Sequence, residues 1–148
     1  IRSYVDFVLT FEELQGMFDA KGVDFKKLPD GEPLMQASAD GRGFASSGGV
    51  ASAVVNAIRR MEPNREVKVV SAEGLANCKK MLQLAKAGKY NGYLLEGMAC
   101  PGGCIAGAGT IQPIKKTAAS LEQMKKQAPF EESMDTVYDA MLPILEKL

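Results

Sequence analysis

The 148-residue sequence contains no histidine, and this absence excludes several kinds of chemistry. Catalysis by a histidine acid or base, Ser-His-Asp triads and metal sites with imidazole ligands are all ruled out. Any metal must therefore be bound by cysteine or carboxylate. The chain also has no excess of positive charge, because 18 lysines and arginines balance 18 aspartates and glutamates. Nucleic-acid binding normally needs a basic surface, so we expect no nucleic-acid partner.

Cysteine is scarce as well, with three residues in the whole chain. Small secreted domains built on disulfides usually carry an even number of cysteines, so no disulfide framework is predicted. Neither a signal peptide nor an apolar run of membrane-spanning length is present in the sequence. We therefore expect a cytoplasmic protein without a membrane partner. The chain opens at Ile1 rather than at methionine, which favours a fragment of a larger protein.

The order of the apolar patterns predicts an α/β fold. The length of 148 residues fits one domain, and a hydrophobic content of 46% allows a real core. Segments rich in β-branched and aromatic residues predict strands over residues 4–9, 66–71 and 92–96. The last two strands with the helix between them form a βαβ unit, which is almost always right-handed. We expect a three-layer lobe with a small, mostly parallel sheet flanked by helices, followed by a C-terminal helical tail.

Local signals mark the ends of the first helix. Thr10 and Glu13 form a capping-box pattern before an amphipathic segment, and Gly22 is placed to end it. Prolines and glycines predict a loop over residues 26–43.

Two further helices are predicted around the second strand. Ser46 or Ser47 can cap a helix over residues 49–61, and a helix over residues 75–87 ends at Gly88. Their inner faces are expected to carry Val50, Val54, Val55, Ile58, Leu75, Met81, Leu82, Leu84 and Ala85.

The chain changes character after Pro113. Two helical patterns, over residues 115–127 and 131–146, are separated by Pro129. The apolar residues expected to be buried in the tail are Leu121, Met124, Met134, Val137, Tyr138, Met141 and Ile144.

A glycine-rich turn after the third predicted strand carries the chemistry of the chain. Residues 96–109 read EGMACPGGCIAGAG, in which Cys100 and Cys104 lie four positions apart. Thiolates are soft ligands that favour iron–sulfur clusters, zinc and copper. Gly102 and Gly103 let the backbone approach a bulky cluster, because glycine has no Cβ. The spacing by itself is also compatible with a disulfide, a zinc half-site or two structural thiols. If the turn binds an iron–sulfur cluster, it supplies two of the four usual ligands.

The turn lies where an α/β protein is expected to bind a ligand. Open α/β sheets bind ligands beyond the carboxyl ends of their strands, and Cys100 follows the predicted strand over residues 92–96. The third cysteine, Cys78, falls within the helical pattern over residues 75–87. We expect it to be a structural thiol, since free cysteines commonly behave as small buried hydrophobes.

The sequence of the turn resembles the last cysteine motif of iron-only ([FeFe]) hydrogenases. That motif reads approximately E-x-M-A-C-P-G-G-C, followed by glycines and Gln-Pro, which correspond here to residues 96–104 and to Gln112-Pro113. The other segments that resemble the family are residues 5–10, Glu13-Leu14, residues 22–30, Pro33-Leu34, Ser38, Gly41 and residues 44–50. The first two cysteine motifs of the family lie upstream of this region and are absent. The resemblance thus implies a C-terminal lobe over residues 1–114, a helical extension over residues 115–148, and a missing N-terminal part of the same protein.

The resemblance implies an oxidoreductase that interconverts H₂ with protons and electrons, which it exchanges with a ferredoxin-like carrier. In the family, four cysteines hold a [4Fe-4S] cluster, and the last one bridges it to a two-iron subcluster that carries CO and cyanide; together these form the H-cluster. By matching positions, Cys100 would bind the [4Fe-4S] cluster and Cys104 would be the bridge. Met98 and Phe44 would line the two-iron pocket, although each can also be an ordinary packing residue. Glu96 is expected to hold the turn through hydrogen bonds to amides.

Two departures from the family pattern bear on activity. Residues 107–113 read GAGTIQP where catalysts usually have three glycines directly before Gln-Pro, and residues 45–47 read ASS where GAT is common. These changes resemble the divergent sensory branch of the family. A second hypothesis is a non-catalytic hydrogenase-like iron–sulfur protein in cluster assembly or redox sensing, and a third is a structural domain with reduced or paired cysteines. We expect this chain alone to be inactive and to carry no cluster.

Overall fold

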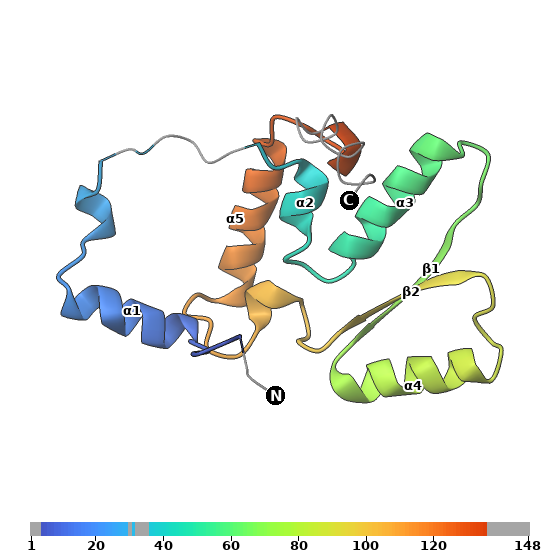
Figure 1. The fold of residues 1–148 in the computed structure, drawn as a ribbon, viewed down its shortest axis with the longest axis horizontal. Coiled ribbons are helices and arrows are strands. Elements are labelled where there is room, and N and C mark those ends of the chain that lie inside the picture. Colours follow the sequence, from blue (N-terminus) through green and yellow to red (C-terminus); the bar gives the residue numbers. More distant parts are fainter. Residues whose placement is uncertain (1–3, 30, 32–35, 136–148) are drawn as a thin grey trace.

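A computed structural model gives the fold of residues 4–29, 31 and 36–135 (Figure 1). The α-helices are α1 (Phe11–Ala20), α2 (Ala39–Gly43), α3 (Gly49–Met61), α4 (Leu75–Lys86) and α5 (Ile114–Lys126). The strands are β1 (Lys68–Glu73) and β2 (Tyr93–Met98). The short 3-10 turns are η1 (Phe25–Lys27), η2 (Cys104–Ala106) and η3 (Ser133–Asp135).

The predicted α/β class is confirmed. Strands β1 and β2 pair in parallel, from Lys68 opposite Tyr93 to Glu73 opposite Met98, and α4 connects them as the predicted βαβ unit. Strand β1 lies two residues further along the chain than the sequence pattern placed it, and β2 begins one residue later and ends two residues later. Helix α4 ends at Lys86 and is followed by Gly88 with a φ of +85°, as its pattern predicts.

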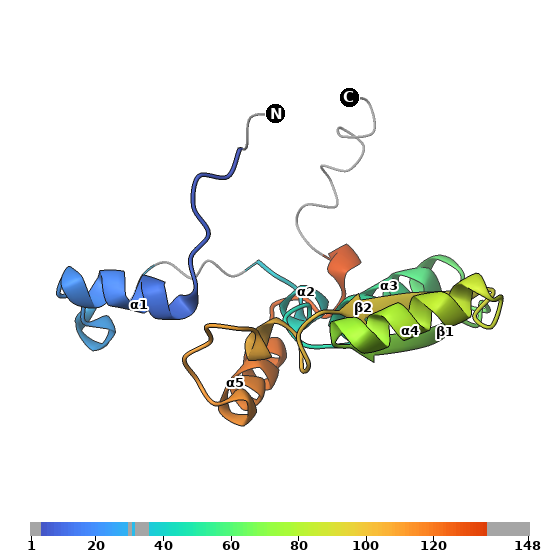
Figure 2. The same ribbon diagram turned by 90° about the horizontal axis from the view of Figure 1, so that it is seen from below.

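Helices α3 and α4 cover opposite faces of this sheet, which gives the predicted three layers (Figures 1 and 2). On β2, the Glu96 carboxylate reaches the backbone amide of Ala51 on α3. A Cβ on the next residue, Gly97, would instead point at Cys78 and Met81 of α4. Adjacent strand residues point to opposite faces, so each helix packs on its own side of the two strands.

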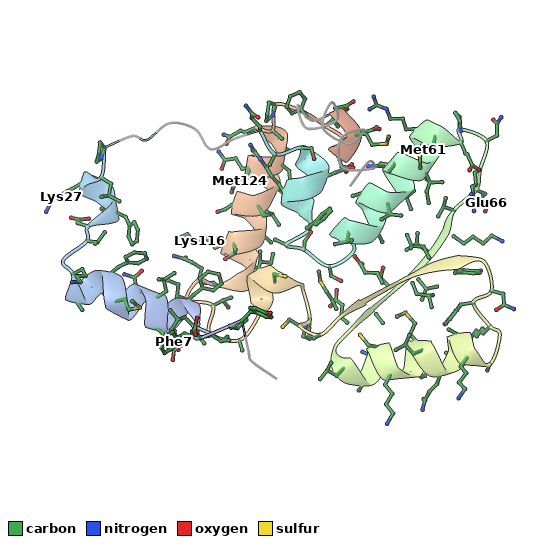
Figure 3. All side chains as sticks on the ribbon, viewed as in Figure 1. Phe7, Lys27, Met61, Glu66, Lys116 and Met124 are labelled. Carbon is green, nitrogen blue, oxygen red and sulfur yellow. The ribbon has the colours of Figure 1, made fainter. Side chains whose placement is uncertain are left out.

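The first predicted strand is wrong. Residues 4–9 are extended but pair with no strand in the described part of the chain. Tyr4, Phe7 and Val8 are 86–98% exposed, and Figure 3 shows Phe7 on the outside of the fold. A β-rich sequence forms a strand only when a neighbouring strand takes its backbone hydrogen bonds, and the described residues offer this segment no such strand.

The loop predicted over residues 26–43 is also partly wrong, because it contains η1 and α2. Ser38 begins α2: its hydroxyl accepts a hydrogen bond from the Gly41 amide at 3.1 Å, and its side chain is buried. Helix α2 then packs against α3 and α5. The Asn56 amide of α3 donates to the Asp40 carboxylate at 3.0 Å, so contacts from distant helices stabilise a segment with poor local helix signals.

Other predicted boundaries had mixed outcomes. The capping box of Thr10 and Glu13 is present, and Gly22 follows α1 with a φ of +67°, so both are confirmed. Helix α3 has the predicted bounds, but its N-cap is Gly48 with a φ of +84° and neither serine caps it. The Ser46 hydroxyl donates to the Gly43 carbonyl instead.

The core is small and made of small residues. Among the described residues, its buried apolar members are Ala51, Ala53, Val55, Met81 and Leu121. Four predicted inner residues are not buried: Val50 (37% exposed), Val54 (38%), Leu82 (58%) and Leu75 (75%). The reason is geometric, because a sheet of two strands covers only a narrow stripe of each helix that packs on it.

The predicted helix over residues 115–127 is confirmed as α5, in which Leu121 is buried and Met124 is 42% exposed. Of the second predicted tail helix, residues 131–135 fall within the described part of the chain, where η3 is a single 3-10 turn and Met134 is half-buried rather than buried. The remaining predictions there, including Val137, Tyr138, Met141 and Ile144, lie outside the described residues, as do Asp30 and Pro33-Leu34. Within the described part, none of the helices combines the length and apolar character needed to cross a membrane.

Candidate functional site

The cysteine turn follows directly on the carboxyl end of β2, as predicted. The strand ends at Met98, and the chain then turns so that the Gly103 amide donates to the Cys100 carbonyl at 3.0 Å. Gly102 and Gly103 have φ values of +87° and +92°, a region that side-chain-bearing residues rarely adopt. The turn that separates the two thiols therefore depends on this glycine pair.

Gly103 also allows close contact with the loop between α2 and α3. A Cβ at Gly103 would lie 2.6 Å from the Ala45 carbonyl oxygen and 2.7 Å from the Ser47 nitrogen. The Ile105 amide donates to the same Ala45 carbonyl at 3.2 Å. The turn is thus packed backbone to backbone on residues 45–47. The structure gives Gly103 a packing reason to be glycine that is independent of any cluster.

The two thiols of the turn differ in exposure. Cys100 is half-buried, Cys104 is exposed, and neither forms a disulfide. The Cys100 sulfur lies 3.6 Å from the place where a Cβ on Gly107 would stand. Two free thiols on one turn suit a soft metal.

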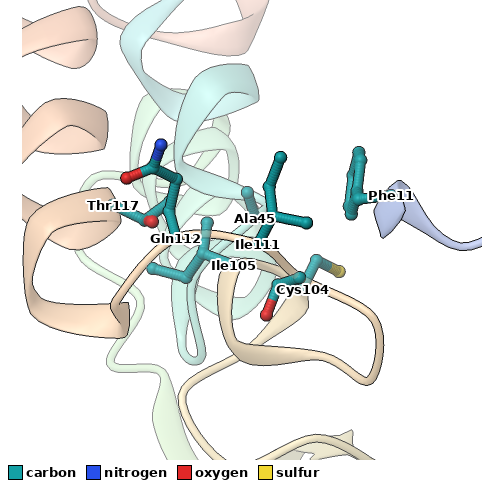
Figure 4. A pocket seen from close by; sticks show the side chains of 8 residues that line it. Phe11, Ala45, Cys104, Ile105, Ile111, Gln112 and Thr117 are labelled. Atoms are coloured by element: carbon teal, nitrogen blue, oxygen red, sulfur yellow. The ribbon is translucent and has the colours of Figure 1, made fainter. Parts of the chain in front are cut away.

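Cys104 lines an apolar pocket of about 280 Å³ (Figure 4). The other lining residues are Phe11, Ala45, Ile105, Thr110, Ile111, Gln112 and Thr117. Phe11 comes from α1 and Thr117 from α5, so segments far apart in the sequence build its walls. Sequence reasoning missed this pocket. Two of its lining residues had nevertheless been singled out, because Gln112 belongs to the family motif and Ile111 to the stretch over residues 107–113 that departs from it.

Met98 lines a different space from Cys104. Its pocket of about 260 Å³ lies between α3 and β2 and includes Val50, Val54 and Leu94. Phe44 is the C-cap residue of α2 and is 45% exposed. The structure therefore does not bring Met98 into the pocket of Cys104, and the roles of Met98 and Phe44 at a cluster stay predictions.

Glu96 forms hydrogen bonds, but not with the cysteine turn. Its carboxylate accepts from the Ala51 amide in the first turn of α3 at 3.1 Å and from the Ser71 hydroxyl at 3.2 Å. A carboxylate at a helix N-terminus interacts favourably with the helix dipole. Glu96 does accept a hydrogen bond from an amide, as expected, but that amide belongs to α3, so the expectation that Glu96 holds the cysteine turn is wrong.

Glu73, which sequence reasoning missed, contacts the cysteine turn instead. It is the last residue of β1, and its carboxylate accepts a hydrogen bond from the Gly102 amide at 3.0 Å. Hydrogen bonding with the Ser47 side chain, and then the bond from the Gly102 amide, hold the pKa of Glu73 below its usual value of 4.5. The predicted strand stopped before Glu73, so nothing in the local pattern marked this residue.

Cys78 lies on α4 and its thiol hydrogen-bonds to the backbone of both strands. Its thiol donates to the carbonyls of Ala72 and Met98 at 3.4 and 3.6 Å, which agrees with the structural role expected for it.

The donor set fits half of a cluster site. Among the described residues, no group of three or more cysteines and carboxylates could hold a metal ion. Cys100 and Cys104 are chemically suited to iron–sulfur ligation, and the remaining ligands would have to come from elsewhere.

Comparison with known proteins agrees with this picture. A family model described as iron only hydrogenase large subunit, C-terminal domain, matches residues 1–108. The chain is 34% identical to the periplasmic [Fe] hydrogenase large subunit of Nitratidesulfovibrio vulgaris, covering 74% of this chain and 32% of the relative. It is 29% identical to the NADP-reducing hydrogenase subunit HndD of Solidesulfovibrio fructosivorans, covering 90% and 29%.

A third relative carries a different name. The chain is 34% identical to a probable cytosolic Fe-S cluster assembly factor of Aedes aegypti, over 55% of this chain and 20% of the relative. In each of the three comparisons the chain spans a third or less of the relative's length.

Proposed function

The chain belongs to the iron-only hydrogenase large-subunit family, in its C-terminal domain, and from this premise we propose that it supplies two thiolate ligands to a shared iron–sulfur cluster. The observation that carries the proposal is the pair of free thiols on one glycine-shaped turn at the carboxyl end of a parallel sheet. The other ligands would come from the part of the protein that corresponds to the remaining two thirds of the relatives.

The proposal gives each site residue a role. Cys100 would bind the [4Fe-4S] cluster, and Cys104 would bridge it to the two-iron subcluster of the H-cluster. When bound, this group supplies the redox chemistry that interconverts H₂ with protons and electrons. Gly102 and Gly103 shape the turn that sets the spacing of the thiols, and Met98 would lie near the subcluster.

Phe44 shares that proposed position beside the two-iron subcluster. The apolar side chains beside Cys104, which include Phe11 and Ile111, would give a bound cluster an apolar surface on one side.

The proposal extends to the whole protein. Its parent would be an oxidoreductase that exchanges electrons with a ferredoxin-like carrier in the cytoplasm, with residues 1–114 as the C-terminal lobe and residues 115–148 as a helical extension. Its activity would be H₂ oxidation and proton reduction, or H₂ sensing in view of the divergent residues 45–47 and 107–113.

A chimera tests the ligand assignment. The segment of the Nitratidesulfovibrio vulgaris hydrogenase large subunit that matches this chain is replaced by the chain, and the protein is matured anaerobically. Iron and acid-labile sulfide are measured, together with the infrared bands of CO and cyanide. We expect Cys104→Ala to remove the infrared bands and Cys100→Ala to lower the iron and sulfide content, while Cys78→Ala retains both. Retention of iron and bands in both turn variants would contradict the proposal.

A role in cluster assembly or redox sensing is the second candidate, because part of the chain resembles a cluster assembly factor. The same chimera separates the two candidates. Iron and sulfide that depend on both cysteines, without CO bands or H₂ turnover, would favour the second. The chain purified by itself should contain no stoichiometric [4Fe-4S] cluster, because it offers two thiolates on the turn and a cubane needs four ligands.

A further inference from the structure

The carboxylate of Glu73 joins three separate parts of the protein. It extends from the last residue of β1 and accepts a hydrogen bond from the Gly102 amide at 3.0 Å, and hydrogen bonding with the nearby Ser47 side chain lowers its pKa. Gly102 lies between the two thiols, and Ser47 belongs to the loop before α3. A single side chain therefore connects a strand end, the cysteine turn and the loop on which that turn packs.

Backbone pairing at the end of β1 places Glu73 beside the start of the cysteine turn. Glu73 pairs with Met98 in the parallel register, and the Gly74 amide donates to the Met98 carbonyl at 2.8 Å. The chain therefore enters the cysteine turn from a position already fixed beside β1. Hydrogen bonds to a carboxylate are roughly twice as strong as neutral ones, so Glu73 is well suited to hold the middle of the turn.

We propose that Glu73 is a positioning residue for the thiols of Cys100 and Cys104. By fixing the Gly102 amide against β1 and the loop of residues 45–47, it sets the separation and direction in which the two sulfurs meet a soft metal. This inference rests on the proposed function, since it assigns Glu73 a task only if the two thiols bind a metal together.

Glu96 provides a matched control within the same sheet. It lies on the neighbouring strand and, like Glu73, accepts a hydrogen bond from a backbone amide, but its partners are Ala51 and Ser71 rather than the turn. A merely structural role predicts that Glu73→Ala and Glu96→Ala have the same consequences. A positioning role predicts that only Glu73→Ala changes how the thiols bind a metal.

Cd²⁺ binding to the full 148-residue chain tests the proposal. Thiolate-to-metal charge-transfer absorption is titrated anaerobically, with Cys100→Ser and Cys104→Ser variants to verify that both thiols bind. We expect Glu73→Ala to weaken Cd²⁺ binding roughly tenfold, the size of one lost charge-assisted hydrogen bond. Glu73→Gln, which keeps an acceptor oxygen, should restore most of it. Glu96→Ala should leave the affinity within about twofold of the wild-type value.

Amide exchange at Gly102 gives a second readout that needs no metal. It should accelerate in Glu73→Ala and stay slow in Glu96→Ala. If Glu73→Ala does not fold, Ser47→Ala is used, which leaves the Gly102 bond intact and should have a smaller effect of the same sign.

The possible results distinguish a failure of the positioning role of Glu73 from a failure of the proposed function. A wild-type chain that binds no Cd²⁺ through the two cysteines contradicts the proposed function, and the positioning role with it. A wild-type chain that binds Cd²⁺, with Glu73→Ala binding equally well, overturns the positioning role and leaves the proposed function standing.

Discussion

Gly103→Ala is the substitution for which the structure gives the sharpest expectation. Gly103 is buried and adopts φ +92° and ψ −164°. An added Cβ would lie 2.6 Å from the Ala45 carbonyl oxygen, 2.7 Å from the Ser47 nitrogen and 2.8 Å from the Ser46 carbonyl carbon. All three are backbone atoms, so no side-chain rotation can relieve the contacts. Either the turn or the loop of residues 45–47 must move.

Two costs add up at this position. The backbone conformation of Gly103 is nearly restricted to glycine and costs other residues about 1–3 kcal/mol. Forcing a methyl group into a packed site costs typically about 1–3 kcal/mol more. We therefore expect Gly103→Ala to lower the free energy of unfolding by about 2–6 kcal/mol, a large share of the roughly 5–15 kcal/mol of an ordinary domain.

Urea unfolding followed by far-UV circular dichroism measures this loss, because the chain has no tryptophan to report unfolding by fluorescence. The midpoint should fall while the slope stays the same. Gly102→Ala is the first control: its φ is +87°, but its closest neighbour is the Ala106 side chain at 3.1 Å, so its loss should be smaller.

Gly16→Ala is the second control. Its Cβ would meet nothing within 4 Å in the middle of α1, so it should stabilise the chain by roughly 0.5–1 kcal/mol. If Gly103→Ala costs no more than Gly102→Ala, the backbone contact between the turn and residues 45–47 has been misjudged.

Further predictions concern the capping box, the thiols and the pocket beside β2. Thr10→Ala should cost about 0.5–2 kcal/mol of helix-capping free energy, seen as faster amide exchange along α1. Hydrogen bonds from the Thr10 backbone and hydroxyl lower the pKa of Glu13 below 4.5. The contribution of the ionised Glu13 carboxylate to the stability of α1 is therefore complete above pH 4.5 and is lost as the pH falls through the lowered pKa. Helicity should drop on acidification, and this drop should be smaller in Thr10→Ala. Exposed Cys104 should react with an aromatic disulfide reagent several-fold faster than half-buried Cys78, and equal rates would contradict this difference in exposure. Met98→Leu should cost less than about 1.5 kcal/mol by thermal unfolding; in the matured chimera, unchanged infrared bands would mean that Met98 only packs between α3 and β2.

The sequence was informative wherever the interaction that forms a structure is local. The capping box of Thr10 and Glu13 joins residues three apart, and Gly22 and Gly88 end helices through their own backbone conformation. The βαβ unit was predictable because its two strands and helix each carry a continuous apolar pattern. The cysteine turn was recognisable because its chemistry and its family motif lie within nine consecutive residues, 96–104.

Only the tertiary structure decided the features that depend on distant partners. Residues 4–9 have the composition of a strand and still form none, because strand formation requires a second strand to accept the hydrogen bonds. Helix α2 exists because α3 and α5 pack on it. Glu73 reaches Gly102 and Ser47, and Phe11 meets Cys104 across a pocket. No local pattern contains such pairs, since the backbone brings them together only after the helices and strands have packed.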